Sequence, residues 1–317
     1  MDAPAPFPAA LAPQLDAWLG QLRTQRQLSP LTVAAYERDV RELAQLAQAA
    51  SWVEIGHNDI RRLTARLHGG GLGPRSIARK LSSWRGFYHW LAGEVALPAN
   101  PVDGVRAPRA PKTLPKALSV DAAVQLVSSV APNRAAEPEE LCNRAMFELM
   151  YSSGLRVSEL AGLDLVYARA PGAGEPLGWL DRDAGEVVVT GKGNKRRRVP
   201  VGSHALAAID AWLAVRPPAR DGGPALFLSS RATRVSPRVV QLRLAAHGVA
   251  RGTTVKVHPH VLRHSFASHV LQSSGDLRAV QDMLGHASIT STQVYTALDF
   301  QHLSAVYDQA HPRAKPK

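Results

Sequence analysis

Apolar residues recur three and four positions apart in the first part of the chain, which is the spacing of helices that bury one face. The repeats are Leu15, Trp18, Leu19 and Leu22, followed by Val33, Tyr36 and Val40. Ser29 and Pro30 predict the start of the second of these helices, because serine caps a helix and proline suits its first position. We therefore expect an all-α N-terminal domain over residues 1–97.

Two further helices are predicted in this domain, around residues 58–67 and 74–91. Asn58 or Asp59 would cap the first of them. The second interleaves apolar residues with basic ones, namely Arg75, Arg79, Lys80 and Arg85. The domain is accordingly expected to present a basic face.

A proline-rich segment, residues 98–118, follows this domain and carries more basic than acidic residues. Proline removes a backbone donor and fixes φ, so a regular helix is excluded here. We interpret the segment as an extended basic linker. The linker would join the N-terminal domain to a second domain over residues 119–317.

The second domain is predicted to be helical with one β interruption. Ser119 is a good cap for its first helix. Two β-rich runs within residues 185–201 flank a glycine-containing turn, which predicts a hairpin with Lys192 at its tip. Residues 168–180 are rich in glycine and proline and are predicted to be a loop inserted before that hairpin.

Composition narrows the partner and the compartment. The chain has 317 residues with 38 Lys and Arg against 26 Asp and Glu, a net charge of +12. Such an excess favours a polyanionic partner, either nucleic acid or an acidic membrane surface. Neither an export signal nor an apolar span of about 20 residues is evident. With a single cysteine, Cys142, no internal disulfide is possible, and we expect a cytoplasmic protein without membrane insertion.

Two cations lie where the backbone would hold them in place. Arg156 follows a predicted helix end at Gly154 and precedes a helix that Ser158 would cap, so its planar fork could face a phosphate. Lys192 lies in a glycine-flanked turn that permits close approach to a ligand. Taken singly, each is also explained as a solvated surface residue.

Two further segments offer imidazole, guanidinium and phenol groups. His260 and Arg263 would share one face of a helix that opens after Pro259. His264 lies four residues from His260 and raises a zinc site as an alternative, but the sequence HVLRH lacks the glutamate of the zinc-protease motif and carries an arginine.

His286 and Tyr295 lie in LGHASITSTQVYT, residues 284–296. Tyr295 stands in a polar surrounding that offers little to bury it. A lone tyrosine of this kind is usually an amphipathic surface residue, and its neighbours in the sequence do not by themselves assign it a role.

Together these residues resemble the active site of the tyrosine recombinases. The set is Arg156, Lys192, His260, Arg263, His286 and Tyr295, carried by GLRVSEL, GKGNKRRRVP, HPHVLRHSFASH and LGHASITSTQVYT. The resemblance covers nearly the whole chain, including SPLTVAAYERDV in the N-terminal part. It implies a SAM-like core-binding domain and an α-helical catalytic domain with a small sheet, which close as a C-shaped clamp on duplex DNA.

The resemblance also implies the chemistry. Tyr295 is the nucleophile and forms a 3′-phosphotyrosyl link, while Arg156 and Arg263 stabilise the charge on the phosphate. Lys192 protonates the leaving 5′-oxygen. No cofactor or metal is implied. The covalent link conserves the energy of the broken bond, so no ATP is needed for rejoining.

The remaining site residues have supporting roles by the same resemblance. His286 adds a hydrogen bond to the phosphate, and His260 helps to deprotonate the tyrosine or holds the phosphate. Glu159 supports the site without touching DNA. His258, His264 and His302 are interpreted as structural.

Within the family the resemblance is greatest to recombinases that resolve chromosome dimers. It implies a dif-like double-stranded DNA site, a XerD-like partner in a heterotetramer and a septal DNA translocase as activator. A phage or transposon integrase of the same family remains an alternative. So does a sequence-specific DNA-binding protein that does not cleave, while the similar chemistry of a type IB topoisomerase finds no specific support.

The C-terminal residues predict one more helix. An apolar stripe runs along it, formed by Phe300, Leu303, Val306 and Tyr307. Such a stripe names no partner, and packing within the same chain is a competing interpretation. The resemblance favours docking onto a neighbouring protomer, which is our expectation for this helix.

Overall fold

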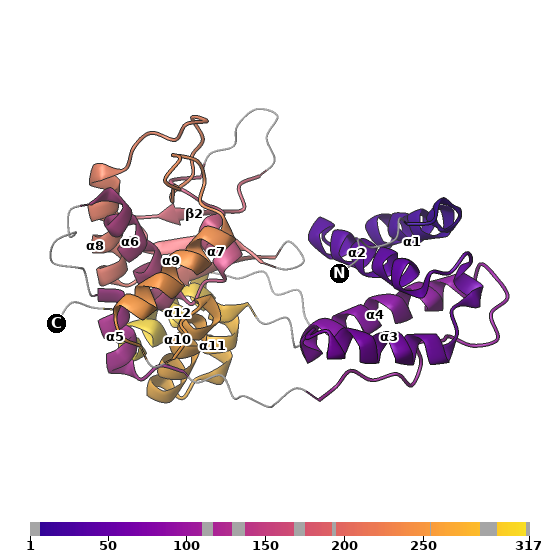
Figure 1. Cartoon of the computed structure of the whole chain (residues 1–317). Coiled ribbons are helices and arrows are strands. Elements are labelled where there is room, and N and C mark those ends of the chain that lie inside the picture. Colours follow the sequence, from indigo (N-terminus) through magenta and orange to yellow (C-terminus); the bar gives the residue numbers. More distant parts are fainter. Residues whose placement is uncertain are drawn as a thin grey trace. The chain divides into compact units, whose positions relative to one another are not determined.

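The computed structural model describes residues 7–109, 117–128, 137–167, 175–191, 195–253, 255–285 and 297–314. Over these residues the chain is mainly helical and has one small sheet, which confirms the predicted fold class in both respects. The chain divides into two compact units, Met1–Thr113 and Leu114–Lys317, here called unit 1 and unit 2 (Figure 1).

Unit 1 consists of helices. In chain order they are the 3₁₀ turn η1 (Ala9–Leu11), α1 (Ala12–Thr24), α2 (Pro30–Ala47), the 3₁₀ turn η2 (Trp52–Glu54), α3 (His57–Gly69) and α4 (Pro74–Leu91). The predicted start of α2 is confirmed, because Ser29 is its cap and accepts a hydrogen bond from the Thr32 amide. The helix predicted over 74–91 is confirmed with the same bounds.

The start of α3 differs from the prediction by one or two residues. The helix begins at His57, and Gly56 occupies the capping position in place of Asn58. The carboxylate of Asp59 accepts a hydrogen bond of 3.0 Å from the Gly56 amide. An acidic residue at the third helical position therefore serves the amide of the capping residue itself, which is one half of a capping box.

Aromatic rings form the centre of unit 1, and their polar ends are satisfied. Trp52 and Trp84 are buried and donate hydrogen bonds from their indole nitrogens to the carbonyls of Leu11 and Asp39, at 3.1 and 2.7 Å. Phe87 packs edge-on against Trp52 with ring centroids 4.6 Å apart. Large rings supply apolar area, while the indole donors fix which segments meet.

Part of the predicted linker belongs to unit 1 and is not extended. Residues 101–104 form a turn, and Val102 and Val105 lie in the core of the unit. Arg85 donates hydrogen bonds to the carbonyls of both valines, at 3.2 and 3.0 Å. Proline excludes a helix here, but it does not prevent the two valines from packing against α4.

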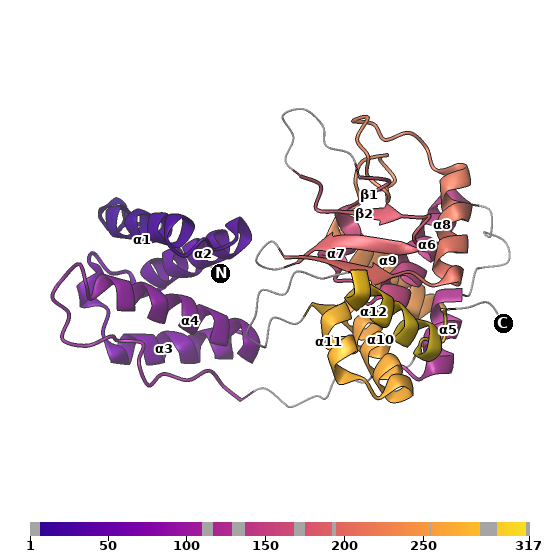
Figure 2. The same ribbon diagram turned by 180° about the vertical axis from the view of Figure 1, so that it is seen from behind.

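Unit 2 is a helical domain with a four-stranded sheet. Its helices are α5 (Val120–Ser128), α6 (Pro138–Ser153), α7 (Val157–Ala161), α8 (Ser203–Val215), α9 (Pro237–Ala250), α10 (Pro259–Ser274), α11 (Leu277–Leu284) and α12 (Ala297–Ala310). Its strands are β1 (Leu163–Asp164), β2 (Gly178–Asp181), β3 (Glu186–Thr190) and β4 (Arg196–Pro200). Figure 2 shows the strands above α10, α11 and α12.

The sheet runs in the order β1-β2-β3-β4, with β1 and β2 parallel and the other pairs antiparallel. The predicted hairpin is present as β3 and β4, while its tip at 192–194 lies outside the described residues. The loop predicted over 168–180 extends too far, because β2 begins at Gly178. A Cβ atom at Gly178 would stand 2.6 Å from the Val188 carbonyl, so glycine is needed for this strand to pair.

Helix α6 runs through the middle of unit 2. From Ala145 to Ser153 each of its residues is buried, including Glu148. A helix that is buried all round must be covered on every side, and α5, α8, α9, α10 and β4 all contact it. In the part of the chain that is described, no helix has the length and apolar character to cross a membrane.

The C-terminal helix α12 packs inside unit 2, as in the competing interpretation, while its docking on another protomer stays a prediction. Leu303 and Tyr307 are 3% and 1% exposed and belong to the same core as α6. The hydroxyls of Tyr307 and Ser152 lie 2.6 Å apart and share a hydrogen bond. The helix is long enough to cross α10, and it contacts both α10 and β4.

The residues after α12 fix the chain end to the same unit. Arg313 forms an ion pair with Glu148, whose side chain is fully buried. The carbonyl of Ala314 accepts a hydrogen bond of 3.0 Å from the Ser203 amide. His311 stacks on Tyr307, and burial lowers the pKa of His311 to about 3, so this imidazole is neutral.

Candidate active site

The joint between α6 and α7 holds Arg156 in a fixed place. Helix α6 ends at Ser153, and Gly154 follows in the left-handed region with φ of 57°. Helix α7 begins at Val157 with Arg156 as its capping residue. Ser158, which was predicted as the cap, lies within the helix. The Arg156 amide donates to the carboxylate of Glu159 at 2.8 Å.

Gly154 has a second constraint, because a Cβ atom there would stand 2.8 Å from Cε1 of Phe266. We expect Gly154→Ala to lower stability by about 2–4 kcal/mol, from backbone strain and from overpacking. Gly275→Ala is the matched control, since Gly275 is also left-handed but has open space around it. Thermal melting compares the two variants, and equal melting temperatures would contradict the role of the Phe266 contact.

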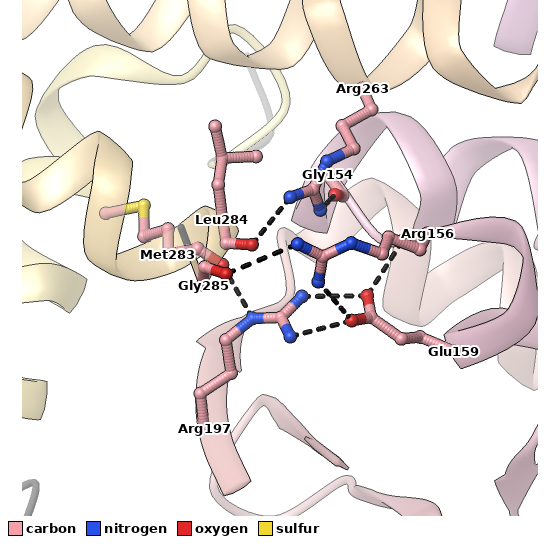
Figure 3. Close-up of polar contacts among 8 residues, drawn as sticks. All are labelled: Gly154, Arg156, Glu159, Arg197, Arg263, Met283, Leu284 and Gly285. Atoms are coloured by element: carbon pink, nitrogen blue, oxygen red, sulfur yellow. Dashed lines mark hydrogen bonds and ion pairs between the residues drawn. The ribbon is translucent and has the colours of Figure 1, made fainter. Parts of the chain in front are cut away.

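Helix α10 brings a second arginine to the same joint. Pro259 is its first residue, as predicted, and His260 follows in an exposed position. Arg263, one turn later, is half-buried and donates to the carbonyls of Gly154 and Leu284, each at 2.6 Å (Figure 3). Arg263 thereby ties α10 to the end of α6 and to the end of α11.

Arg156 reaches the same end of α11. It donates to the Gly285 carbonyl at 3.2 Å and to Glu159 Oε1 at 2.7 Å. Because Leu284 and Gly285 are consecutive, Arg156 and Arg263 are neighbours, as Figure 3 shows. The two guanidinium groups therefore contact the backbone carbonyls of the two residues that directly precede His286 in the sequence.

A third arginine, Arg197 on β4, completes the cluster and was not among the predicted site residues. It makes a bidentate contact with Glu159, with both N···O distances at 2.8 Å. Its Nε donates to the Met283 carbonyl at 2.9 Å. Arg197 is 5% exposed, so it lies behind Arg156 and not at the surface.

The sequence does hold a signal for Arg197. It is the middle of three consecutive arginines in a predicted strand, and side chains alternate between the two faces of a strand. Arg197 therefore shares a face with the apolar Val199, whereas Arg196 and Arg198 face the other way. An arginine on the apolar face of a strand needs a buried partner, and here that partner is Glu159.

The electrostatics of the cluster follow from these contacts. Burial alone would raise the pKa of Glu159, but the hydrogen bonds and charge of Arg197 and then of Arg156 hold it below its ordinary value. Burial and the nearby charge of Arg156 lower the pKa of Arg263 to about 10. Arg263 still carries its proton at neutral pH, and the cluster has three guanidinium groups for one carboxylate.

The structure describes three of the six predicted site residues. It brings Arg156 and Arg263 together, and it places His260 on the same helix as Arg263. Lys192, His286 and Tyr295 lie outside the described residues, although Gly191 and Gly285 directly before two of them are described. Of the histidines interpreted as structural, His302 contacts Asp276 at 3.1 Å.

Comparison with family descriptions matches both units. Residues 116–302 match the Phage integrase family, and residues 15–94 match the phage integrase N-terminal SAM-like domain. The first match alone covers more than half of the chain.

Curated relatives match along their whole length. The chain is 55% identical to "Tyrosine recombinase XerC 1" of Ralstonia nicotianae, covering 100% of this chain and 97% of the relative. It is 47% identical to "Tyrosine recombinase XerC" of Pseudomonas aeruginosa, covering 96% of each. It is 45% identical to the protein of that name from Yersinia pestis, covering 98% of each.

Solved structures share the fold at low identity. A Tn1549 transposon integrase in complex with a circular intermediate DNA matches with a TM-score of 0.67 and 17% identity, over 91% of this chain and 97% of the other. A lambda integrase tetramer bound to a Holliday junction matches with a TM-score of 0.65 and 18% identity, over 89% and 80%.

Proposed function

This chain belongs to the phage integrase family and is a site-specific tyrosine recombinase, and from that premise we propose that it does the work of a XerC protein. In this proposal it cleaves and rejoins double-stranded DNA at a dif-like site, together with a XerD-like recombinase in a heterotetramer. The reaction would separate a chromosome dimer into its two monomers before cell division. Identity of 45% or more to XerC proteins over the full length supports this choice over a phage or transposon integrase.

The observation that carries the proposal for the site is the pair Arg156 and Arg263. The two positive charges lie at neighbouring carbonyls and repel each other. Burial is the first cause of the lowered pKa of Arg263, and the charge of Arg156 is the second. A fold holds such a pair at a cost, and a bound anion removes that cost. A phosphodiester carries its charge on two non-bridging oxygens, which suits two planar guanidinium groups.

The proposed reaction exchanges one phosphodiester for another. The oxygen of Tyr295 attacks the scissile phosphorus, and the bond to the 5′-oxygen breaks as the bond to tyrosine forms. The tyrosine proton leaves with the help of His260, and Lys192 supplies a proton to the 5′-oxygen. Attack by a 5′-hydroxyl of another strand reverses these steps and rejoins the DNA without hydrolysis.

The arginines and His286 act on the transferred phosphate. Phosphoryl transfer is accelerated chiefly by positive charge that faces the oxygens where negative charge grows. Arg156 and Arg263 are already held in place by backbone carbonyls before DNA binds, so little reorganisation is needed. His286 follows Gly285 directly and would add a hydrogen bond to the same phosphate.

We expect Lys192→Ala to cleave ordinary DNA slowly, with rescue on a substrate that carries a 5′-bridging sulfur. A thiolate leaves without a proton, so the missing general acid no longer matters. Single-turnover cleavage of both substrates measures the effect, and a loss of roughly 10²–10⁴-fold is expected on ordinary DNA. Arg263→Ala is the control without rescue, and equal impairment of Lys192→Ala on both substrates would remove its assignment as the acid.

The test of the function is covalent capture on DNA. Genomic fragments from the region of the replication terminus are nicked next to the candidate cleavage position and incubated with the protein, with and without a XerD-like partner. A covalent adduct that forms at one two-part inverted site supports the proposal. Specific binding without any adduct would favour a DNA-binding protein that does not cleave.

Four finer parts of the proposal rest on the likeness to XerC proteins. A septal DNA translocase would activate the complex, and action on chromosomal DNA would place the protein in the cytoplasm. Binding to duplex DNA would rest mainly on phosphate contacts, consistent with the net charge of +12. Residues 1–97, together with the turn that carries Val102 and Val105, would form the core-binding domain. Residues 119–317 would form the catalytic domain, joined to it by the rest of the basic linker predicted over 98–118.

A further inference from the structure

The carboxylate of Glu159 lies between Arg156 and Arg197 and accepts hydrogen bonds from both. Its Oε1 accepts from Arg156 NH1 at 2.7 Å and from Arg197 NH1 at 2.8 Å. Its Oε2 accepts from the Arg156 amide and from Arg197 NH2, both at 2.8 Å. Four donors fill the lone pairs of one carboxylate. The three residues share one negative charge, and they keep a net charge of +1.

We propose that Arg197 is a positioning residue for DNA cleavage, which neutralises Glu159 so that the charge of Arg156 stays available to the scissile phosphate. The inference rests on the proposed function, since it concerns the same site. Arg197 does not touch the DNA in this proposal. It acts through Glu159 and through the backbone at the end of α11.

The charge argument follows from the burial of Glu159. Its side chain is 4% exposed, so its negative charge is poorly screened by water. If Arg197 is removed, Arg156 remains as its ion-pair partner in the cluster of Figure 3. An ion pair between Glu159 and Arg156 has no net charge, and the site would lose much of its attraction for a phosphate.

The backbone argument concerns the turn before His286. Arg197 donates to the Met283 carbonyl, and Gly285 lies over its side chain. A Cβ atom at Gly285 would stand 3.1 Å from Cδ of Arg197, and the φ of Gly285 is 63°. The chain thus turns at Gly285 directly against Arg197. One side chain on β4 fixes both Glu159 and the point from which the catalytic segment departs.

The test is a two-residue cycle on a nicked suicide substrate that the wild type cleaves. We expect Arg197→Gln to slow cleavage by roughly 10- to 100-fold, on the scale of losses that follow when residues supporting the ligands of a metal site are removed. Adding Glu159→Gln to Arg197→Gln removes the negative charge that would otherwise neutralise Arg156. The double variant is therefore expected to cleave about tenfold faster than Arg197→Gln alone. A residue that merely stabilises the fold would show no such recovery.

Two further variants complete the design. Arg196→Gln is the matched control, because it removes the same charge from the preceding position of β4, where the side chain is 38% exposed, pairs with the exposed Glu175 and faces away from Glu159. It is expected to cleave within about threefold of the wild type, as surface substitutions usually have small effects. Arg197→Lys keeps the charge but loses the bidentate contact, and its rate is expected to lie nearer the wild type than that of Arg197→Gln.

The outcomes separate the two proposals. Cleavage by the wild type with no recovery in the double variant would overturn the role of Arg197 and leave the function intact. If the wild type forms no adduct on any site, the proposed function itself is wrong. Circular dichroism and DNA affinity are measured for each variant. If Arg197→Gln does not fold, Arg197→Lys decides, and a folded Arg197→Lys whose cleavage is lost by 10-fold or more overturns the charge argument.

Discussion

A Tyr295→Phe protein is expected to bind duplex DNA as the wild type does and to form no covalent complex with it. The substitution removes one oxygen, the proposed nucleophile, and leaves the ring and the net charge unchanged. We expect adduct formation on a nicked suicide substrate to fall by at least about 10⁴-fold, the scale found when a covalent nucleophile is removed. Denaturing gels measure the adduct, and fluorescence anisotropy measures DNA affinity.

Tyr167→Phe provides the matched control for this prediction. Tyr167 lies in unit 2, is 48% exposed and packs edge-on against Trp179. Tyr167→Phe removes the same hydroxyl oxygen away from the arginine cluster, so adduct formation at the level of the wild type is expected. If Tyr295→Phe still forms an adduct of normal yield, another residue is the nucleophile.

Ending the chain after Gln301 is expected to unfold unit 2 or to lower its melting temperature severely. The deletion removes the buried side chains of Leu303 and Tyr307 and leaves Glu148 buried without Arg313. A lost buried aromatic costs about 3–5 kcal/mol, and a buried ion pair broken on one side costs about as much. Total stabilities are typically about 5–15 kcal/mol, so little would remain. Circular dichroism with thermal melting of the isolated monomer gives the measurement.

A pair of full-length variants isolates the ionic part of this effect. Arg313→Met leaves the Glu148 carboxylate unpaired and is expected to cost about 3–5 kcal/mol, whereas Arg313→Met combined with Glu148→Leu restores most of the loss. A truncated chain that melts at the wild-type temperature would show that the tail contributes nothing to its own unit. That result would return α12 to the role expected from its family, docking on a neighbouring protomer.

Local signals explain what the sequence predicted well. Caps, first-turn prolines and helical spacing act within a few residues, and they located α4 and the starts of α2 and α10. The joint at Arg156 was predicted from Gly154 for the same reason. The assignment of Ser158 as the cap was wrong, because Glu159 serves the Arg156 amide from within the first turn.

Long-range partners explain what the sequence did not show. Strand β2 is short, begins with Gly178 after a stretch rich in glycine and proline, and pairs with the distant β1 at Leu163, so its first residues resembled a loop. Arg197 matters because of Glu159, 38 residues away. Alternation along the strand marks Arg197 as the inward-facing arginine of the three, but only the fold shows which carboxylate it meets. The stripe on α12 was recognised, but Ser152 and Glu148, which fix the tail within unit 2, lie 155 and 165 residues from their partners.

The point where the linker enters unit 2 is attached to the helix that carries Arg263. The Leu118 amide donates to Ser265 Oγ at 3.0 Å, and His269 donates from Nε2 to the Leu118 carbonyl at 2.9 Å. Burial lowers the pKa of His269, so the ring is neutral and its Nδ1 accepts from the Tyr151 hydroxyl. Ser265 is two residues beyond Arg263 on α10. A mechanical pull along the linker is therefore borne first by α10, where tension would move the arginine that must meet the phosphate.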